Sequence, residues 1–307
     1  MKYLFLLLPA LLFLFPAASF AGARAGLLLW FDSILPSLLP CLILSDLCIR
    51  FGVVTIIAAR LKNIGRILFG LSPFGCYPAF LGFLSGLPAG AKAASDLYLR
   101  GNISKEEAEY VITFCNNVSP IFLINYAASD QLGLPSFGYP LCAVIWLSSV
   151  LSGRLMLLIK RKGASPLVSQ TCASVTAAET RTIIEETDEA ILDSFYILIR
   201  TGGYIVLFSV LSRILLFTAG SGPAACALSG ILETTTGIRA IADSAAPLSV
   251  KVPAVAAAAA FGGLSGFAQT VSVTARAGLS TGRYLVSRLL GALFAAAFAW
   301  IWYMTLG

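Results

Sequence analysis

Long apolar stretches alternate with short polar joints along the chain. The stretches that we predict to be membrane segments are 26–49, 67–100, 105–128, 136–159, 191–217, 222–243, 252–277 and 283–305. A helix needs about 20 residues to cross a bilayer, so the chain supplies about eight to ten crossings or half-crossings. The pattern therefore predicts an all-α polytopic membrane protein.

Four stretches are interrupted by Gly, Ser, Pro or polar residues, at 85–90, 116–120, 233–237 and 262–270. Backbone groups inside a bilayer must be hydrogen-bonded, so a broken helix survives only where protein or a water-filled cavity surrounds it. Closely packed helices use the same small residues, and a single Gly/Ser break is weak evidence. Four breaks in matching halves predict a polar cavity near the middle of the bilayer.

The two halves of the chain echo each other. Leu-Ser-Gly occurs at 84–86 and again at 264–266. Asp-Ser occurs at 32–33 and again at 193–194, each time at the predicted start of an apolar helix. These echoes predict an inverted-repeat bundle with broken helices and re-entrant hairpins. We expect the two Leu-Ser-Gly breaks to face each other near the midplane.

The interrupted stretches are predicted to be of two kinds. Segments 67–100 and 252–277 are predicted to be hairpins that turn back at their Gly-rich breaks. Segments 105–128 and 222–243 are predicted to be helices that continue beyond a break. Both kinds leave helix ends inside the bilayer, where N–H or C=O groups can hold a polar solute.

Residues 1–20 have two interpretations. A basic start, an apolar run and small residues near its end fit a secretory signal, whereas the length of the run and the spans that follow fit a first transmembrane helix. We expect one integral membrane domain, with a first half at 21–160 and a second half at 191–307. Polar and acidic residues dominate 161–190, which predicts a flexible cytoplasmic loop that ends in an acidic helix start.

Composition and charge support the membrane class. Hydrophobic residues make up 58% of the chain and charged residues 12%, whereas a soluble globular chain carries roughly 25% charged residues. The net charge of +6 comes from Lys and Arg at joints such as 60–66 and 160–162, which we expect to be cytoplasmic. We therefore expect a multi-pass protein of the cell membrane, in contact with the lipid bilayer and not with nucleic acid.

The residue types argue against a metal site or an enzyme. The chain has no His, and its seven Cys are scattered without a CxxC pair, so the usual ligands of zinc or haem are missing. No nucleotide-binding loop and no paired catalytic motif occurs. We expect no enzyme activity, no metal and no cofactor.

Polar side chains and glycines at the breaks are the candidate solute-binding residues. They are Ser85, Gly86, Lys92, Asn116, Asn117, Ser119, Glu233, Thr234, Thr235, Ser265, Gly266 and Gln269. Glu233 is the only acid between Asp193 and Asp243, and an intramembrane carboxylate is a functional candidate. We expect it to share one cavity with Asn116. Lys92 belongs to the site if it lies deep, but it can also extend to the bilayer surface.

Five motifs resemble those of a known family. They are LWFDSILPSLLP at 29–40, LSGLPAGAK at 84–92, NNVSP at 116–120, LETTTG at 232–237 and GGLSGFAQ at 262–269. Their order resembles that of sporulation integral membrane proteins of the YlbJ type, over nearly the whole chain. By resemblance this family belongs to the nucleoside-recognition or Gate-domain group. Relatives often have a His before the Gln of the last motif, where this chain has Phe267-Ala268.

The resemblance implies a membrane protein of spore formation, needed for the spore cortex or for heat resistance. It implies no particular substrate, because one fold hosts many functions. With the broken helices, it predicts a transporter or permease-like protein for an unidentified small polar solute. The alternative is a non-transporting scaffold for spore-envelope assembly, which a dry, packed centre would favour. A homo-oligomer is compatible with both.

Overall fold

The computed structural model describes residues 9–160 and 182–306, which form helices and no strands. The elements are α2 (Pro16–Leu29), η1 (Trp30–Ile34), α3 (Leu35–Arg50), α4 (Val54–Phe69), α5 (Cys76–Ser85), α6 (Ala89–Leu99), α7 (Lys105–Cys115), η2 (Phe122–Gln131), η3 (Pro135–Phe137), α8 (Gly138–Lys160), α9 (Ile183–Ala219), α10 (Pro223–Leu232), α11 (Thr234–Asp243), α12 (Leu248–Phe261), α13 (Gly263–Thr274), η4 (Ala275–Ala277) and α14 (Gly282–Leu306). Within these ranges five helical segments are long and apolar enough to cross a membrane. The prediction of an all-α polytopic membrane protein is confirmed.

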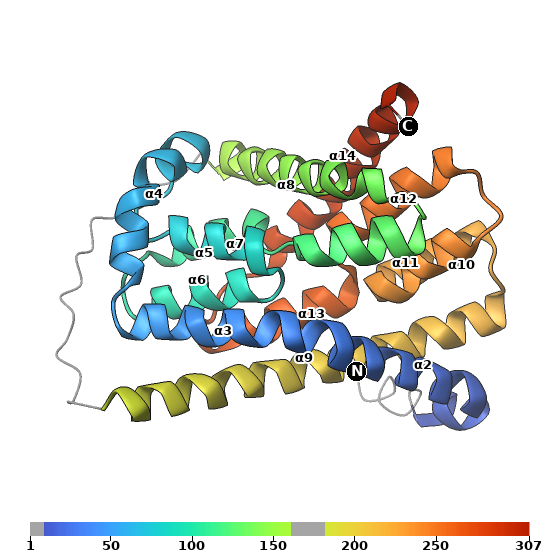
Figure 1. Ribbon diagram of the computed structural model, residues 1–307, viewed down its shortest axis with the longest axis horizontal. Helices are drawn as coiled ribbons and strands as arrows, with labels where there is room; N and C mark the ends of the chain where they lie inside the picture. Colours follow the sequence, from blue (N-terminus) through green and yellow to red (C-terminus); the bar gives the residue numbers. More distant parts are fainter. Residues whose placement is uncertain (1–8, 161–181, 307) are drawn as a thin grey trace.

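Two long antiparallel helices lie along one side of the molecule (Figure 1). One is the continuous span of α2, η1 and α3, and the other is α9. Gly26 lies against Val206, Trp30 Nε1 donates to the Leu198 carbonyl at 2.9 Å, and Arg50 meets the first turns of α9. Residue numbers therefore rise along one helix as they fall along the other.

The N-terminal span corrects two predictions. Pro16–Arg50 is one span, so residues 16–20 do not form a crossing separate from 26–49; residues 1–8 lie outside the described part. Asp32 lies inside the π-helical turn η1 and Asp193 lies in the interior of α9, so neither opens a helix. Pro36 explains the wide turn, because its ring clashes with the carbonyl four residues earlier.

The first half continues with an amphipathic helix, a hairpin, an interrupted helix and a span. The helix α4 lies at an angle to α3 (Figure 1), and its bases Arg60, Lys62 and Arg66 are exposed. We call this end of the molecule, with α4 and Arg50, the basic end. Helices α5 and α6 fold back on each other, with the next two crossing segments, α7–η2 and α8, beside them. The predicted hairpin and interrupted helix of this half match the structure.

In the second half, the hairpin and the interrupted helix are exchanged relative to the prediction. The segment 222–243 is a hairpin, because α10 and α11 fold back at Glu233 until Gly237 lies against Gly230. Glu233 adopts an extended conformation and caps α11 with its own side chain, which permits the reversal. The segment 252–277 instead continues through its break, as part of the single span Leu248–Ala277.

The two halves form an inverted repeat. Each contains a long helix, a hairpin, an interrupted helix and a span in the same order. The hairpin α5–α6 enters from the basic end, and α10–α11 enters from the opposite end (Figure 1). The final spans α8 and α14 are antiparallel, because Ser152 contacts Ser287 at 3.0 Å while Phe137 lies 4.4 Å from Trp302 between ring centroids. The tip of the first hairpin is thus equivalent to Glu233, and the Leu-Ser-Gly echo joins non-equivalent positions.

The start of α9 shortens the predicted loop between the halves. Thr182 caps the helix by accepting from the Glu185 N–H at 3.3 Å, and the Glu185 carboxylate accepts from the Thr182 N–H at 2.8 Å. Residues 183–190 are therefore helical, as the acidic start predicted. The remainder of the predicted loop, 161–181, lies outside the described residues.

Apolar side chains form two main clusters. One is centred on α5, α6 and α7, where the rings of Phe69 and Phe114 stack with centroids 4.6 Å apart. The other joins η2, α8, α12 and α14. Many other large apolar side chains are exposed, such as Phe20 at 73% and Phe31 at 60%, which fits contact with lipid.

Candidate functional site

A small central cavity lies where the four helix breaks meet. Its volume is about 90 Å³. Nine of the twelve candidate residues line it: Ser85, Gly86, Ser119, Glu233, Thr234, Thr235, Ser265, Gly266 and Gln269. Apolar residues from α3, η2 and α9 complete the wall. Both hairpin tips and both interrupted helices thus contribute to one site.

The tip of the first hairpin packs against the break of the first interrupted helix. Gly86 has a φ of +91°, a conformation that favours glycine. A Cβ at Gly86 would lie 2.8 Å from the backbone nitrogen of Ser119. The next N–H, that of Leu87, donates to the Asn117 carbonyl at 2.6 Å. These contacts build one side of the cavity from α5–α6 and α7–η2.

Glu233 stabilises the turn of the second hairpin. It is 3% exposed, and its carboxylate accepts hydrogen bonds from the Thr235 N–H at 3.1 Å, the Thr236 N–H at 2.7 Å and the Thr235 hydroxyl. The positive end of the α11 dipole favours this anion. Beside it the Thr234 hydroxyl is buried without a hydrogen-bond partner among the described residues. Because Thr234 also lines the cavity, its unpaired hydroxyl is a candidate hydrogen-bonding group for a solute.

Helix α13 presents its N-terminal end to the cavity. Gly262, in a left-handed conformation with φ +79°, is its N-cap residue and offers no side chain to the first N–H groups. Ser265 and Gly266 lie in the first turn, and Gln269 Nε2 donates to Ser265 Oγ at 3.2 Å. The N–H groups at a helix N-terminus attract anions. A solute with an acidic or strongly accepting group therefore matches this side of the cavity.

Three candidate residues lie outside the cavity lining: Lys92, Asn116 and Asn117. Both asparagines are fully buried. Asn116 Nδ2 donates to Thr270 Oγ1 at 2.5 Å and to the Tyr284 hydroxyl at 3.1 Å. Asn117 Nδ2 donates to a carbonyl of its own helix. Glu233 and Asn116 therefore do not share the cavity, because Asn116 turns toward α13 and α14 at the break.

Arg288 of α14 was absent from the candidates. It is 2% exposed, and its guanidinium bonds to the Asn117 side chain and to backbone carbonyls near the break of α7. A signal existed in the sequence, because Arg288 is a lone charge within an apolar run of α14. A charged residue so far into a span is functional or paired.

A second cavity, which we call the vestibule, lies between the central cavity and the basic end. Its volume is about 340 Å³, and Gln269 lines both cavities. Its charged lining residues are Asp46, Arg50, Lys92, Asp96, Arg100, Asp193, Arg200 and Arg276. They come from α3, from α6 and the residue after it, from α9 and from η4. Gln269 thus lies between the two cavities.

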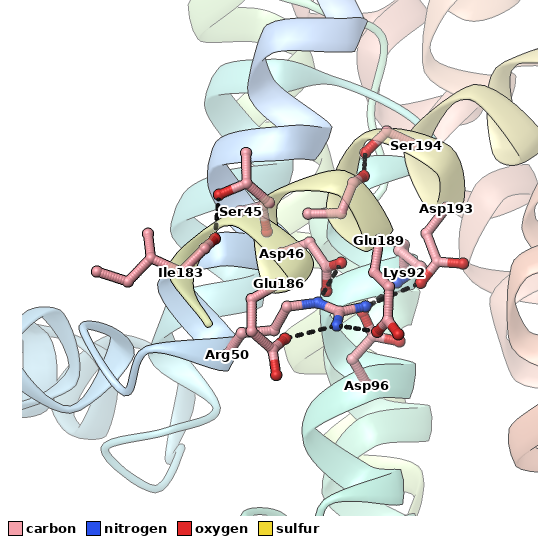
Figure 2. A network of polar contacts seen from close by, with 12 residues as sticks. Ser45, Asp46, Arg50, Lys92, Asp96, Ile183, Glu186, Glu189, Asp193 and Ser194 are labelled. Carbon is pink, nitrogen blue, oxygen red and sulfur yellow. Dashed lines mark hydrogen bonds and ion pairs between the residues drawn. The ribbon is translucent and has the colours of Figure 1, made fainter. Parts of the chain in front are cut away.

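Carboxylates gather around Arg50 at one edge of the vestibule (Figure 2). Its Nε lies 2.9 Å from Asp46, its Nη1 2.8 Å from both Glu186 and Glu189, and its Nη2 3.0 Å from Asp193. Three of these acids lie on one face of α9, at helical spacing. Arg50 thereby joins the long helix of the first half to that of the second half.

Basic side chains form another part of the vestibule wall. Lys92 forms an ion pair with Asp96, one turn later in α6. Arg100, Arg200 and Arg276 have no carboxylate within ion-pair distance among residues 9–160 and 182–306. Arg200 donates to the Tyr196 hydroxyl and lies over its ring, with the guanidinium carbon 4.2 Å from the ring centroid. Guanidinium groups without a carboxylate partner can still donate to an anion.

Fold and site together define a polytopic helical membrane protein, built as an inverted repeat of discontinuous helices around a small central cavity. The chain is similar to the sporulation integral membrane protein YlbJ of Bacillus subtilis (strain 168). They share 30% identity over 325 aligned positions, which cover 96% of this chain and 80% of the relative. The chain therefore belongs to the YlbJ-type family of sporulation integral membrane proteins. No protein-family profile and no solved structure matches it.

Proposed function

We propose that this sporulation-associated protein is a transporter or permease-like protein that binds a small polar solute in the central cavity. The observation that supports this most strongly is that four helix breaks, two from each half, line one cavity. Broken helices leave backbone groups unpaired in a bilayer and persist where those groups line a cavity. Membership of the Gate-domain group stays a prediction.

The chemistry of the two cavities favours a solute with an acidic group. The α13 N-terminus and the Thr234 hydroxyl offer hydrogen-bond donors in the central cavity. The Glu233 carboxylate lines the same cavity, and N–H groups of α11 already donate to it. The basic wall of the vestibule would attract an anion toward them. The central cavity has room for a group the size of a carboxylate, and Leu38 and Phe122 would contact an apolar remainder.

Its physiological role, in this proposal, is transport across the cell membrane in support of spore cortex formation or heat resistance. The basic end then faces the cytoplasm, following the positive-inside rule. We assign no catalytic step to the protein. The alternative is a scaffold for spore-envelope assembly, which requires no ligand in either cavity.

A ligand-dependent thermal shift screen on purified protein tests the proposal. The panel contains dipicolinate, amino acids, nucleosides and cell-wall precursors. A solute at 100 times its Kd stabilises the protein by about 2.7 kcal/mol, and we expect an acidic member to do so. Thr234→Val should melt like the wild type without ligand and lose the shift, whereas Thr305→Val, an exposed residue of α14, should keep it.

Three results would count against the proposal. A shift with neutral solutes alone would overturn the acidic assignment. A shift that Thr234→Val retains would place the binding site elsewhere. The absence of any shift, together with no uptake of panel members by proteoliposomes, would favour the scaffold.

A further inference from the structure

A cation is buried at the meeting point of the two interrupted helices. Arg288 is 2% exposed, yet no Asp or Glu in the described part of the chain lies within ion-pair distance of it. Instead, Nη1 donates to the carbonyl oxygens of Asn116 at 3.1 Å and Ala260 at 3.2 Å, and Nη2 to that of Thr113 at 3.5 Å. A buried charge normally needs a counter-charge or several hydrogen bonds, and here carbonyl groups serve that purpose.

These carbonyl groups belong to two helix ends that converge. Thr113 and Asn116 lie at the C-terminal end of α7, and Ala260 lies in the last turn of α12. The C-terminal end of a helix carries a partial negative charge of about half an elementary charge. Two such ends facing one guanidinium can therefore balance its single positive charge.

Two polar side chains also accept from the guanidinium, the Tyr284 ring centroid lies 5.5 Å from its carbon, and Nε has no hydrogen-bond partner among the described residues. Asn117 Oδ1 accepts from Nη1 at 2.9 Å, and Ser149 Oγ lies 3.4 Å from Nη2. Every atom that accepts from Arg288 is therefore a neutral oxygen. Neutral oxygens at the ends of discontinuous helices are the groups that coordinate Na⁺ or take part in H⁺ coupling in secondary transporters.

We propose that the Arg288 guanidinium occupies the place of a monovalent cation at the junction of α7 and α12. The junction is then held together by a covalently attached charge, and it does not require Na⁺ or K⁺. The charge comes from α14 alone, because its repeat partner α8 contributes only hydroxyl groups here, such as that of Ser149. This inference goes beyond the proposed function and can be tested without any solute.

The test measures thermal stability of purified protein in sodium, potassium or choline chloride at equal ionic strength. The wild type should melt at the same temperature in all three salts. Arg288→Ala removes the guanidinium and leaves its oxygen ligands, so sodium or potassium should raise its melting temperature dose-dependently above that in choline. Arg283→Ala, an exposed arginine of the same helix, should behave like the wild type.

If Arg288→Ala does not fold, two further variants test whether the positive charge of Arg288 stabilises the junction. Arg288→Lys retains a positive charge, whereas Arg288→Met has similar length and none. We expect the lysine variant to be the more stable, and insensitive to the choice of salt. Equal stability of the lysine and methionine variants would overturn the proposal. So would a wild type that needs sodium or potassium, or a folded Arg288→Ala that melts alike in all salts.

Discussion

Replacing Glu233 by alanine should remove the cap that stabilises the second hairpin at the cavity. The carboxylate accepts from two N–H groups, at 3.1 and 2.7 Å, and from one hydroxyl. Loss of an N-cap side chain costs about 1–2 kcal/mol. Hydrogen bonds to charged groups contribute about 1.5–3 kcal/mol each, although water in the cavity can replace part of them. We therefore expect the free energy of unfolding to fall by about 2–3 kcal/mol.

The corresponding change in melting temperature is measurable. With an unfolding entropy of about 2.1 cal/mol/K per residue, a loss of 1 kcal/mol lowers the melting temperature of a 307-residue chain by ~1.5 °C, so Glu233→Ala should melt roughly 3–5 °C below the wild type. Glu233→Gln keeps one acceptor oxygen for the α11 N–H groups, so its melting temperature should fall less. The assay is thermal unfolding of the detergent-purified protein, followed by intrinsic fluorescence.

An exposed acid supplies the control for Glu233. Asp130 of η2 is exposed, and Asp130→Ala should melt with the wild type. If Glu233→Ala also melts with the wild type, the cap does not stabilise the hairpin. If Glu233→Gln loses as much stability as the alanine variant, the negative charge matters and not the acceptor geometry.

The remaining predictions concern the packing of the hairpin and the ion pairs at the basic end. Gly237→Ala would place a Cβ on the backbone of Gly230, and such overpacking should destabilise by about 1–3 kcal/mol. The control Gly203→Ala, whose Cβ meets no atom within 4 Å, should be neutral in the same unfolding assay. Equal melting temperatures of the two variants would contradict the close packing of Gly237 against Gly230. Arg50→Gln should cost about 1–2 kcal/mol, because a partly exposed ion pair is screened by water. Arg60→Gln, at an exposed site on α4, should have no effect, and an equal loss in both would show that the carboxylates around Arg50 contribute nothing specific.

The positions of the helix breaks were predictable from the sequence. Glycines, hydroxyls and amides in otherwise apolar stretches cannot be satisfied by lipid, and each of the four predicted breaks contributes to the central cavity. The direction of the chain after a break was not predictable. It depends on local geometry, such as the capping of α11 by Glu233 at one break and the left-handed glycines 262 and 263 at another.

The orientation of side chains around a break was also beyond the sequence. Asn116 looks like a cavity residue by its position, but hydrogen bonds to Thr270 and Tyr284 turn it toward other helices. Those partners lie more than 150 residues from Asn116 in the sequence, and no local sequence pattern predicts the contacts. Arg288 carried a detectable signal, a charge within an apolar span. Its role emerges only when α7 and α12 are seen to end beside it.

The helix α4 has a consequence for how the two hairpins sit in the bilayer. In the first half it lies between the long helix and the hairpin, with apolar side chains such as Ile64 and Ile67 and three bases exposed, the composition of a helix that rests among lipid headgroups. In the second half only residues 220–222, two of them glycine, separate α9 from α10. The hairpin α5–α6 is thus linked to a helix at the surface of a leaflet, whereas the hairpin α10–α11 is linked to α9 by a short glycine-containing turn.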